Sequence, residues 1–145
     1  MNLPFSTPRI DHERVVAAIA LAELNTSGEI RVIVAKHRVK DPVASAQAYF
    51  DKLGMANSAH RNGVLLLVAP RSRRFAVIGD SGVHEKCGDA FWTGLAEAMG
   101  GFFKKGDFTD GIVHGVERAG QLLCQTFPRK PGDATAGAPS VTEVD

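Results

Sequence analysis

Two apolar segments, residues 30–35 and 64–69, constrain the fold of this chain more than any other feature. The first, Ile-Arg-Val-Ile-Val-Ala, is rich in β-branched residues, and the second, Val-Leu-Leu-Leu-Val-Ala, contains no polar residue. Runs of this length and composition are typical of strands that are covered on both faces. Both segments therefore predict strands inside a sheet that has helices on its two sides.

A helix is predicted between these two strands. Asp41-Pro42 is a favourable helix start, because proline is tolerated at the first helical position, and Gly54 marks the end. A strand–helix–strand unit makes the two strands parallel, with a right-handed crossover. Residues 74–78 predict a third strand, which the short turn at residues 70–73 must place antiparallel to the second.

Three more helices are predicted around this unit. Asp11 is a plausible N-cap for a helix that ends at residues 25–28, because its carboxylate can accept from free amides of the first turn. Residues 80–82 lead into a long helix, whose end Gly100-Gly101 should loosen or break. Asp107 caps the last helix. The predicted fold class is α/β, a three-layer α/β/α sandwich around a short mixed sheet that combines a βαβ unit with an antiparallel hairpin.

The chain ends differ in composition from the segment between them. Residues 1–9 hold two prolines and are predicted to be irregular, whereas residues 10–127 form the α/β domain. Residues 128–145 are rich in Pro, Gly, Ala, Ser and Thr and lack an apolar period. Such a composition predicts a disordered C-terminal tail.

Charge and hydropathy bear on the partners and the compartment. The formal net charge is +1, which gives no reason to expect nucleic acid or an anionic membrane as a partner. No run approaches the roughly 18 apolar residues of a membrane span, and the first residues do not resemble a signal peptide. We therefore expect no membrane insertion and a cytoplasmic protein.

Polar residues flank the predicted strands at one end of the sheet. The start of the first strand, the start of the second and the finish of the third must meet there, because the first two are parallel and the third runs back. We therefore expect Glu29, Asn62 and Asp80 around a polar cleft, with Glu85 and Asp89 near it at the beginning of the long helix.

This cleft suits three kinds of chemistry. Carboxylate and amide oxygens are the ligands that Ca²⁺ and Mg²⁺ prefer, and all five residues named above could take part. Two close carboxylates, Asp80 and Glu29, could also serve in acid–base catalysis. A helix N-terminus with Arg61 nearby could instead hold a phosphate. The residues alone do not choose among these uses.

Each residue of the cleft also has a purely structural interpretation. Asp80 can cap the long helix, Asn62-Gly63 can be a turn, and Glu29 can pair with Arg31 or Arg61. Glu85 and Asp89 favour a first helical turn through the helix dipole alone. A zinc site with His60 and His84 is conceivable, but the close spacing of zinc ligands is missing. The common motifs for hydrolases, nucleotide binding and metalloproteases are absent, so no organic cofactor is expected.

Several short segments, taken together, resemble the TPM domain family. They are residues 26–32, 61–66 and 74–82, then Phe91-Trp92 and residues 106–111, and they occur in the order and spacing of that family over residues 10–127. The resemblance implies an α/β/α sandwich with divalent metal binding, usually of calcium, or a phosphatase-like activity. It carries over to Glu29, Asn62, Asp80, Glu85 and Asp89. Many family members have Asp-Asn-Gly where this chain has Arg61-Asn62-Gly63.

Three functions follow as hypotheses. The first is a domain that binds a divalent metal or a small ligand without strong catalysis. The second is a phosphoric monoester hydrolase, so whether the chain is an enzyme stays open at this point. The third is a protein-interaction module, which would contact an unknown protein partner through the cleft, the tail from Arg129 or the basic tip at residues 71–74.

Overall fold

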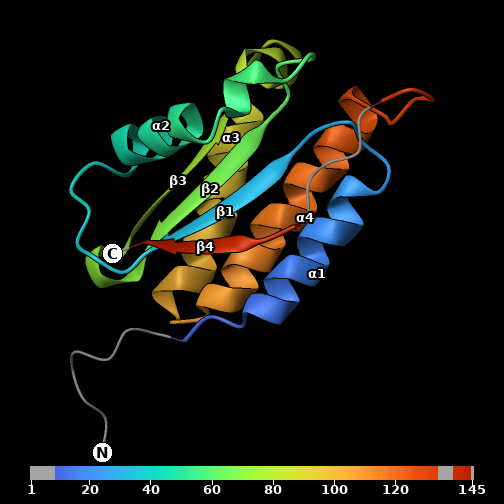
Figure 1. Cartoon of the computed structure of the whole chain (residues 1–145). Helices are drawn as coiled ribbons and strands as arrows, with labels where there is room; N and C mark the ends of the chain where they lie inside the picture. Colours follow the sequence, from blue (N-terminus) through green and yellow to red (C-terminus); the bar gives the residue numbers. More distant parts are fainter. Residues whose placement is uncertain (1–8, 134–138, 145) are drawn as a thin grey trace, which may run out of the picture.

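The computed structural model describes residues 9–133 and 139–144, and within them four helices surround a four-stranded sheet (Figure 1). The helices are α1 (His12–Glu23), α2 (Pro42–Lys52), α3 (Ser81–Lys104) and α4 (Phe108–Thr126). The strands are β1 (Ile30–Ala35), β2 (Val64–Ala69), β3 (Arg74–Gly79) and β4 (Val141–Val144). The expected segment 1–9 lies outside the described residues except for Arg9.

The sheet has the strand order β3-β2-β1-β4 and the mixed topology that the sequence predicts. β1 and β2 are parallel, with Ile30 opposite Val64, and β2 and β3 are antiparallel, with Val64 opposite Gly79. The two predicted pairings are therefore confirmed.

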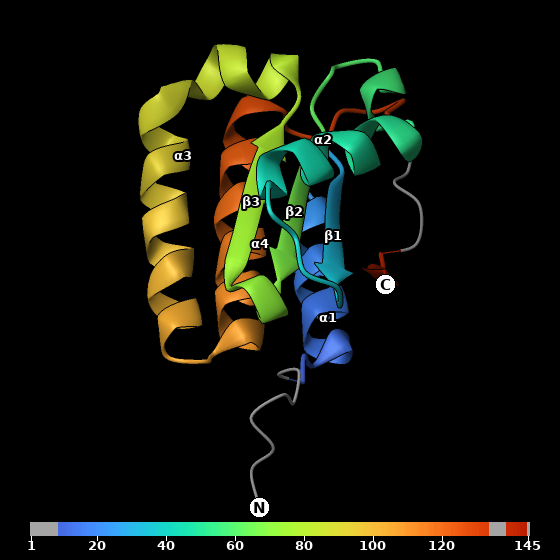
Figure 2. The same cartoon turned by 90° about the vertical axis from the view of Figure 1, so that its left-hand side faces the viewer.

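Helices cover both faces of the sheet, which gives the expected three layers. α1, α3 and α4 lie on one face and α2 lies on the other (Figures 1 and 2). The larger core cluster lies on the three-helix side and includes Val32 and Leu66, whereas Ile33 and Leu67 point to the α2 side. All six residues of β2 are buried, as expected for a central strand.

Aspartates cap three of the helices as the sequence indicates. Asp11 accepts from the amide of Arg14 and Asp41 from that of Ala44, each satisfying an amide that has no partner within its own helix. Asp80 accepts from the amide of Ser81 at the start of α3. Asp107 precedes α4 without a side-chain cap.

α3 breaks at a different glycine from the expected pair. Gly88 has φ 72° and ψ 171°, a non-helical conformation that interrupts the helix after two turns, whereas α3 continues through Gly100 and Gly101. A residue with a side chain rarely adopts this positive φ, so the kink depends on glycine.

The prediction of a disordered tail over residues 128–145 is wrong for residues 141–144. These residues form β4, which pairs in parallel with β1, with Val32 opposite Val141 and Ala35 opposite Val144. A strand of four residues has too few positions to show a convincing alternation, and its partner lies more than one hundred residues earlier. The pairing is set by the free edge of β1, which no local pattern reveals.

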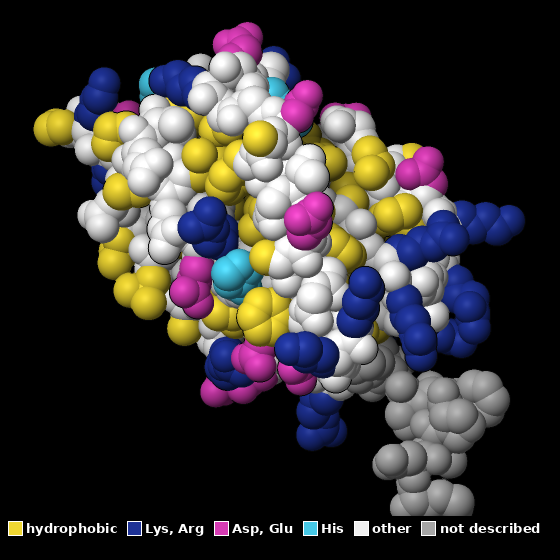
Figure 3. Space-filling model, turned by 180° about the vertical axis from the view of Figure 1, so that it is seen from behind, with side chains coloured by type: hydrophobic (Ala, Val, Ile, Leu, Met, Phe, Trp, Pro, Cys, Tyr) yellow, Lys and Arg dark blue, Asp and Glu magenta, His cyan; other side chains and the backbone are white. Residues whose placement is uncertain are grey.

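None of the described helices is long and apolar enough to cross a membrane. On the face seen from behind, acidic and basic side chains are interspersed, with hydrophobic side chains between them (Figure 3). A charge distribution of this kind agrees with the near-neutral composition of the chain.

Candidate functional site

The three strand ends that flank the predicted cleft lie side by side. The amide of Val64 donates to the carbonyl oxygen of Glu29 at 2.8 Å, and the amide of Asp80 donates to that of Gly63 at 2.9 Å. The backbones of residues 29, 62–63 and 80 therefore form one continuous end of the sheet. We call Glu29, Arg61, Asn62 and Asp80 the strand-end site.

A bidentate ion pair occupies the centre of this site. Nε of Arg61 lies 2.8 Å from Oδ2 of Asp80, and Nη2 lies 2.7 Å from Oδ1. The side chain of Asp80 is only 5% exposed, whereas that of Arg61 is 50% exposed. A planar guanidinium that donates to both oxygens of a carboxylate is one of the stronger ion-pair geometries in proteins. Both acceptor oxygens of Asp80 are thus engaged by Arg61.

These contacts also determine the charge state of Asp80. The hydrogen bonds from Arg61 are the main cause that lowers the pKa of the Asp80 carboxyl, and the amide of Ser81, 2.7 Å from Oδ1, lowers it further. Asp80 is therefore a stable carboxylate rather than a group that is ready to exchange a proton near neutral pH.

The loop that carries Arg61 is held against the start of α3. Arg61 itself has a positive φ of 51°, and its carbonyl oxygen accepts from the amide of Gly82 at 2.9 Å. A Cβ on Gly82 would lie 2.4 Å from the carbonyl oxygen of His60, so only glycine allows this approach. The close contact fixes where the guanidinium of Arg61 can reach.

The two other predicted residues have different partners. Asn62 is buried, and its Nδ2 donates to Oγ of Ser27 at 3.0 Å, which ties the start of β2 to that of β1. The carboxylate of Glu29 pairs with Nη2 of Arg31 at 3.3 Å, one of the two partners considered from the sequence. Both side chains of this pair are about one third exposed.

Glu85 and Asp89 follow the capping residue Asp80 on α3. Both are exposed, and the non-helical Gly88 between them interrupts the helix, so they do not share a continuous helical turn. The early turns of α3 therefore do not bring them together in the way that a straight helix would.

The strand-end site holds no preformed cluster of acidic or imidazole metal ligands. Among residues 9–133 and 139–144, no three or more His, Cys, Asp or Glu side chains are grouped to hold a metal ion. The oxygens of Asp80 that would face such an ion accept from Arg61 instead. The guanidinium of Arg61 supplies the positive charge beside the buried carboxylate.

Two buried polar residues near the site were missed by the sequence reasoning. Glu23, at the end of α1, accepts from the amide of Ile30 at 2.9 Å, and Thr26 donates to the carbonyl oxygen of Phe127 at 2.6 Å. A glutamate in the last turn of a helix opposes the helix dipole, and this unusual position is the signal that could have drawn attention to Glu23.

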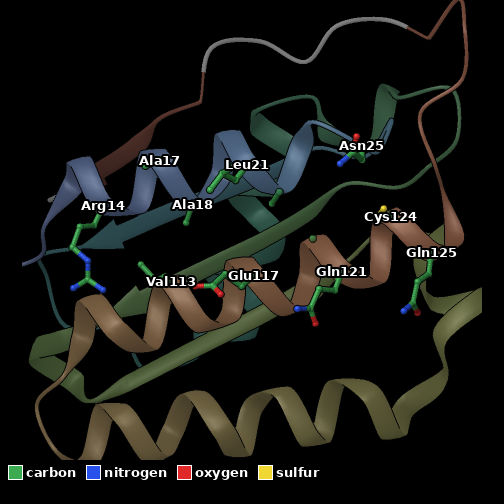
Figure 4. Close-up of a pocket in the computed structure, with 12 residues that line it drawn as sticks. Arg14, Ala17, Ala18, Leu21, Asn25, Val113, Glu117, Gln121, Cys124 and Gln125 are labelled. Carbon is green, nitrogen blue, oxygen red and sulfur yellow. The ribbon is translucent and has the colours of Figure 1, made fainter.

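A shallow groove lies outside the strand-end site, between α1 and α4. It encloses about 740 Å³ and is open to solvent (Figure 4). Small side chains form much of its surface, and Leu21, on α1, is 70% exposed beside it. Arg14 lies at one end, where it pairs with Asp110 at 2.8 Å. Its lining residues are Arg14, Ala17, Ala18, Leu21, Ala22, Asn25, Val113, Glu117, Gly120, Gln121, Cys124 and Gln125.

Comparisons with known proteins give one family and several similar structures. The sequence profile of the TPM domain matches residues 9–122. The solution structure of the BA42 protein from the psychrophilic bacterium Bizionia argentinensis is similar at 37% identity and a TM-score of 0.83, and 92% of each chain is covered. No curated protein matches the chain significantly.

Two more distant structures share the fold alone. The N-terminal domain of the cg2496 protein from Corynebacterium glutamicum has 16% identity and a TM-score of 0.60, with 91% of this chain and 77% of that one covered. The N-terminal domain of a protein from P. gingivalis has 18% identity and a TM-score of 0.64, with 77% and 72% covered.

Proposed function

Because this chain belongs to the TPM domain family, we propose that it is a binding domain whose strand-end site is built for a cation and is filled by Arg61. The proposal rests on one observation, the bidentate contact between Arg61 and the buried carboxylate of Asp80. A buried carboxylate needs a positive partner, and here the chain provides one itself.

Calcium binding in this chain is then a competition. Asp80, Asn62 and Glu29 carry the oxygens that a divalent cation prefers, but the ion must first displace the guanidinium from Asp80. It must also approach a site to which Arg61 adds positive charge. We therefore expect weak calcium binding in the natural chain. Phosphatase-like hydrolysis by Asp80 and Glu29 stays a prediction of the family resemblance.

The position of Arg61 offers a direct test. Arg61→Asp introduces the Asp-Asn-Gly sequence that many family members have, and it removes the competing guanidinium while adding a carboxylate. Aspartate tolerates the positive φ of this position, so the loop should keep its shape. Titration calorimetry with CaCl₂ should show binding about tenfold tighter, or more, than in the natural chain, since an added charged oxygen ligand raises calcium affinity.

Arg61→Asn is the matched control for this experiment. Asparagine has the same shape and the same tolerance of positive φ as aspartate but carries no charge. We expect the asparagine variant to bind calcium less tightly than the aspartate variant. If neither variant releases or absorbs heat at millimolar calcium while both stay folded by circular dichroism, the strand-end site is not a cation site and the proposal is wrong.

A further inference from the structure

The outer edge of β1 holds a short strand from the far end of the chain. β4 pairs in parallel with β1 over four residue pairs, from Val32 with Val141 to Ala35 with Val144. The amide of Lys36 continues the ladder by donating to the carbonyl oxygen of Val144 at 2.7 Å. β1 is buried on both faces by the helical layers and pairs with β2 along its other side, so a further strand can reach its backbone only along this edge.

The pairing side chains define what this edge recognises. Val141 packs on the three-helix side of the sheet, and Val144 packs on the α2 side. Between them, Oε1 of Glu143 lies 3.0 Å from Nε2 of His12, and Oε2 lies 3.2 Å from Nζ of Lys36. These two basic side chains lower the pKa of Glu143, with Lys36 contributing most. The edge thus combines two apolar contacts with a basic clamp for one carboxylate.

β4 makes few stabilising contacts with the rest of the domain. It has four residues, none of which is fully buried, and the side chains of Glu143, His12 and Lys36 are 37–50% exposed. Each ion pair at this exposure contributes about 1 kcal/mol or less, because water competes for both charges. Residues 127–140 join α4 to β4. β4 therefore resembles a tethered peptide ligand, whose occupancy depends on the tether as well as on its contacts.

We propose that the outer edge of β1 is a docking groove for an extended acidic peptide of a partner protein, and that residues 141–144 are its intramolecular occupant. Main-chain hydrogen bonds would give such a peptide its affinity, and the apolar contacts and the basic clamp would select its sequence. The expected pattern is apolar, any residue, acidic, apolar, as in Val-Thr-Glu-Val. This inference does not rest on the strand-end site, which lies at the other end of β1.

The test is a competition between the tail and a peptide supplied in solution. A fluorescein-labelled peptide of residues 139–145, Pro-Ser-Val-Thr-Glu-Val-Asp, is titrated into the full chain and into its Glu143→Lys variant, with anisotropy as the readout. The lysine loses both contacts of Glu143 and places a second positive charge beside Lys36, so the variant's own tail should leave the groove. We expect the variant to bind the peptide about tenfold tighter, or more, than the natural chain.

Two controls separate docking from general charge effects. Glu97→Lys makes the same change of charge at an exposed position of α3, and it should leave peptide affinity as in the natural chain. A second peptide with lysine in place of its glutamate should bind the Glu143→Lys variant at least several-fold more weakly than the natural peptide.

Three results would overturn the proposal. One is equal peptide affinity in the natural chain and the Glu143→Lys variant, since the tail would then not occupy the binding site. Another is equal binding of the glutamate and lysine peptides. The third is a concentration-dependent dimer of the natural chain that disappears in Glu143→Lys, which would assign the groove to exchange of tails between copies.

Discussion

Glu23 joins the end of α1 to the start of β1 through a buried carboxylate. Burial is the main cause that raises its pKa, and the neighbouring charge of Glu29 raises it further, while the amide of Ile30 acts in the opposite direction. The folded protein therefore binds more protons than the unfolded chain between the ordinary glutamate pKa and the raised one. In that window the free energy of unfolding decreases as the pH rises.

Replacing Glu23 by glutamine should remove this pH dependence. Glutamine keeps an oxygen that can accept from the amide of Ile30, but it does not titrate. As the pH rises from about 4, the free energy of unfolding of the natural chain should decrease relative to that of Glu23→Gln. Urea unfolding at a series of pH values measures this difference. Glu13→Gln is an exposed change on the same helix, and its free energy of unfolding should vary with pH as that of the natural chain does. If the free energy of unfolding of Glu23→Gln also varied with pH in this way, the assignment to Glu23 would be wrong.

At the residue scale, the sequence predicts the positions of polar groups better than their partners. Asp80 was expected at the start of the long helix, and it does cap α3. The pairing of Arg61 with Asp80 was not predicted, because it depends on the positive φ of Arg61 and on the contact of its loop with Gly82. Arg61 and Asp80 are nineteen residues apart, so no local spacing pattern in the sequence indicates that they pair.

Among the elements, α1 and α4 approach each other closely because α4 has a glycine at the contact. A Cβ on Gly120 would lie 2.5 Å from Cβ of Ala22, which is part of a rigid side chain that cannot move aside. Gly120→Ala should therefore push the helices apart and lower the free energy of unfolding by about 1–3 kcal/mol. Urea unfolding measures the loss.

Gly94→Ala is the matched control for this prediction. Gly94 lies within α3, and a Cβ there would meet no atom within 4 Å. The same substitution at this position should raise the free energy of unfolding by about 0.4–1 kcal/mol, because alanine restricts the unfolded chain and favours the helix. Equal effects of the two substitutions on the free energy of unfolding would mean that the close contact of α1 with α4 does not require glycine at position 120.

Element boundaries were predictable where a local signal exists. The capping aspartates and the apolar runs locate α1, α2, β1 and β2 from sequence. The break in α3 was expected at Gly100-Gly101 but occurs at Gly88. Glycine allows a non-helical conformation but does not require one, so the sequence alone does not show which glycine interrupts the helix.

At the scale of the whole molecule, the three layers follow from the order of the elements. The βαβ unit and the short hairpin fix the order and direction of β1, β2 and β3, and the remaining helices must cover the open face. The fourth strand could not be predicted in this way. β4 pairs with a strand that lies more than one hundred residues earlier in the chain, and no local pattern indicates this pairing. The composition of residues 128–145 is also typical of a linker.

The sheet should also exchange its amide hydrogens unevenly. β2 is paired on both sides and covered on both faces, whereas β4 is a short outer strand with half-buried side chains. In deuterium oxide, the amides of β2 should exchange only through global unfolding, and those of β4 should exchange much faster through local opening. Exchange followed by NMR measures both, and equal protection of the two strands would contradict this prediction.

The complete enclosure of β2 has a practical consequence. Because the amides of β2 should exchange only when the entire protein unfolds, their exchange rates give the global free energy of unfolding without any denaturant. A ligand that binds only the folded chain would slow these rates in proportion to its occupancy, wherever on the surface it binds. The innermost strand can thus serve as a detector when candidate ligands are screened.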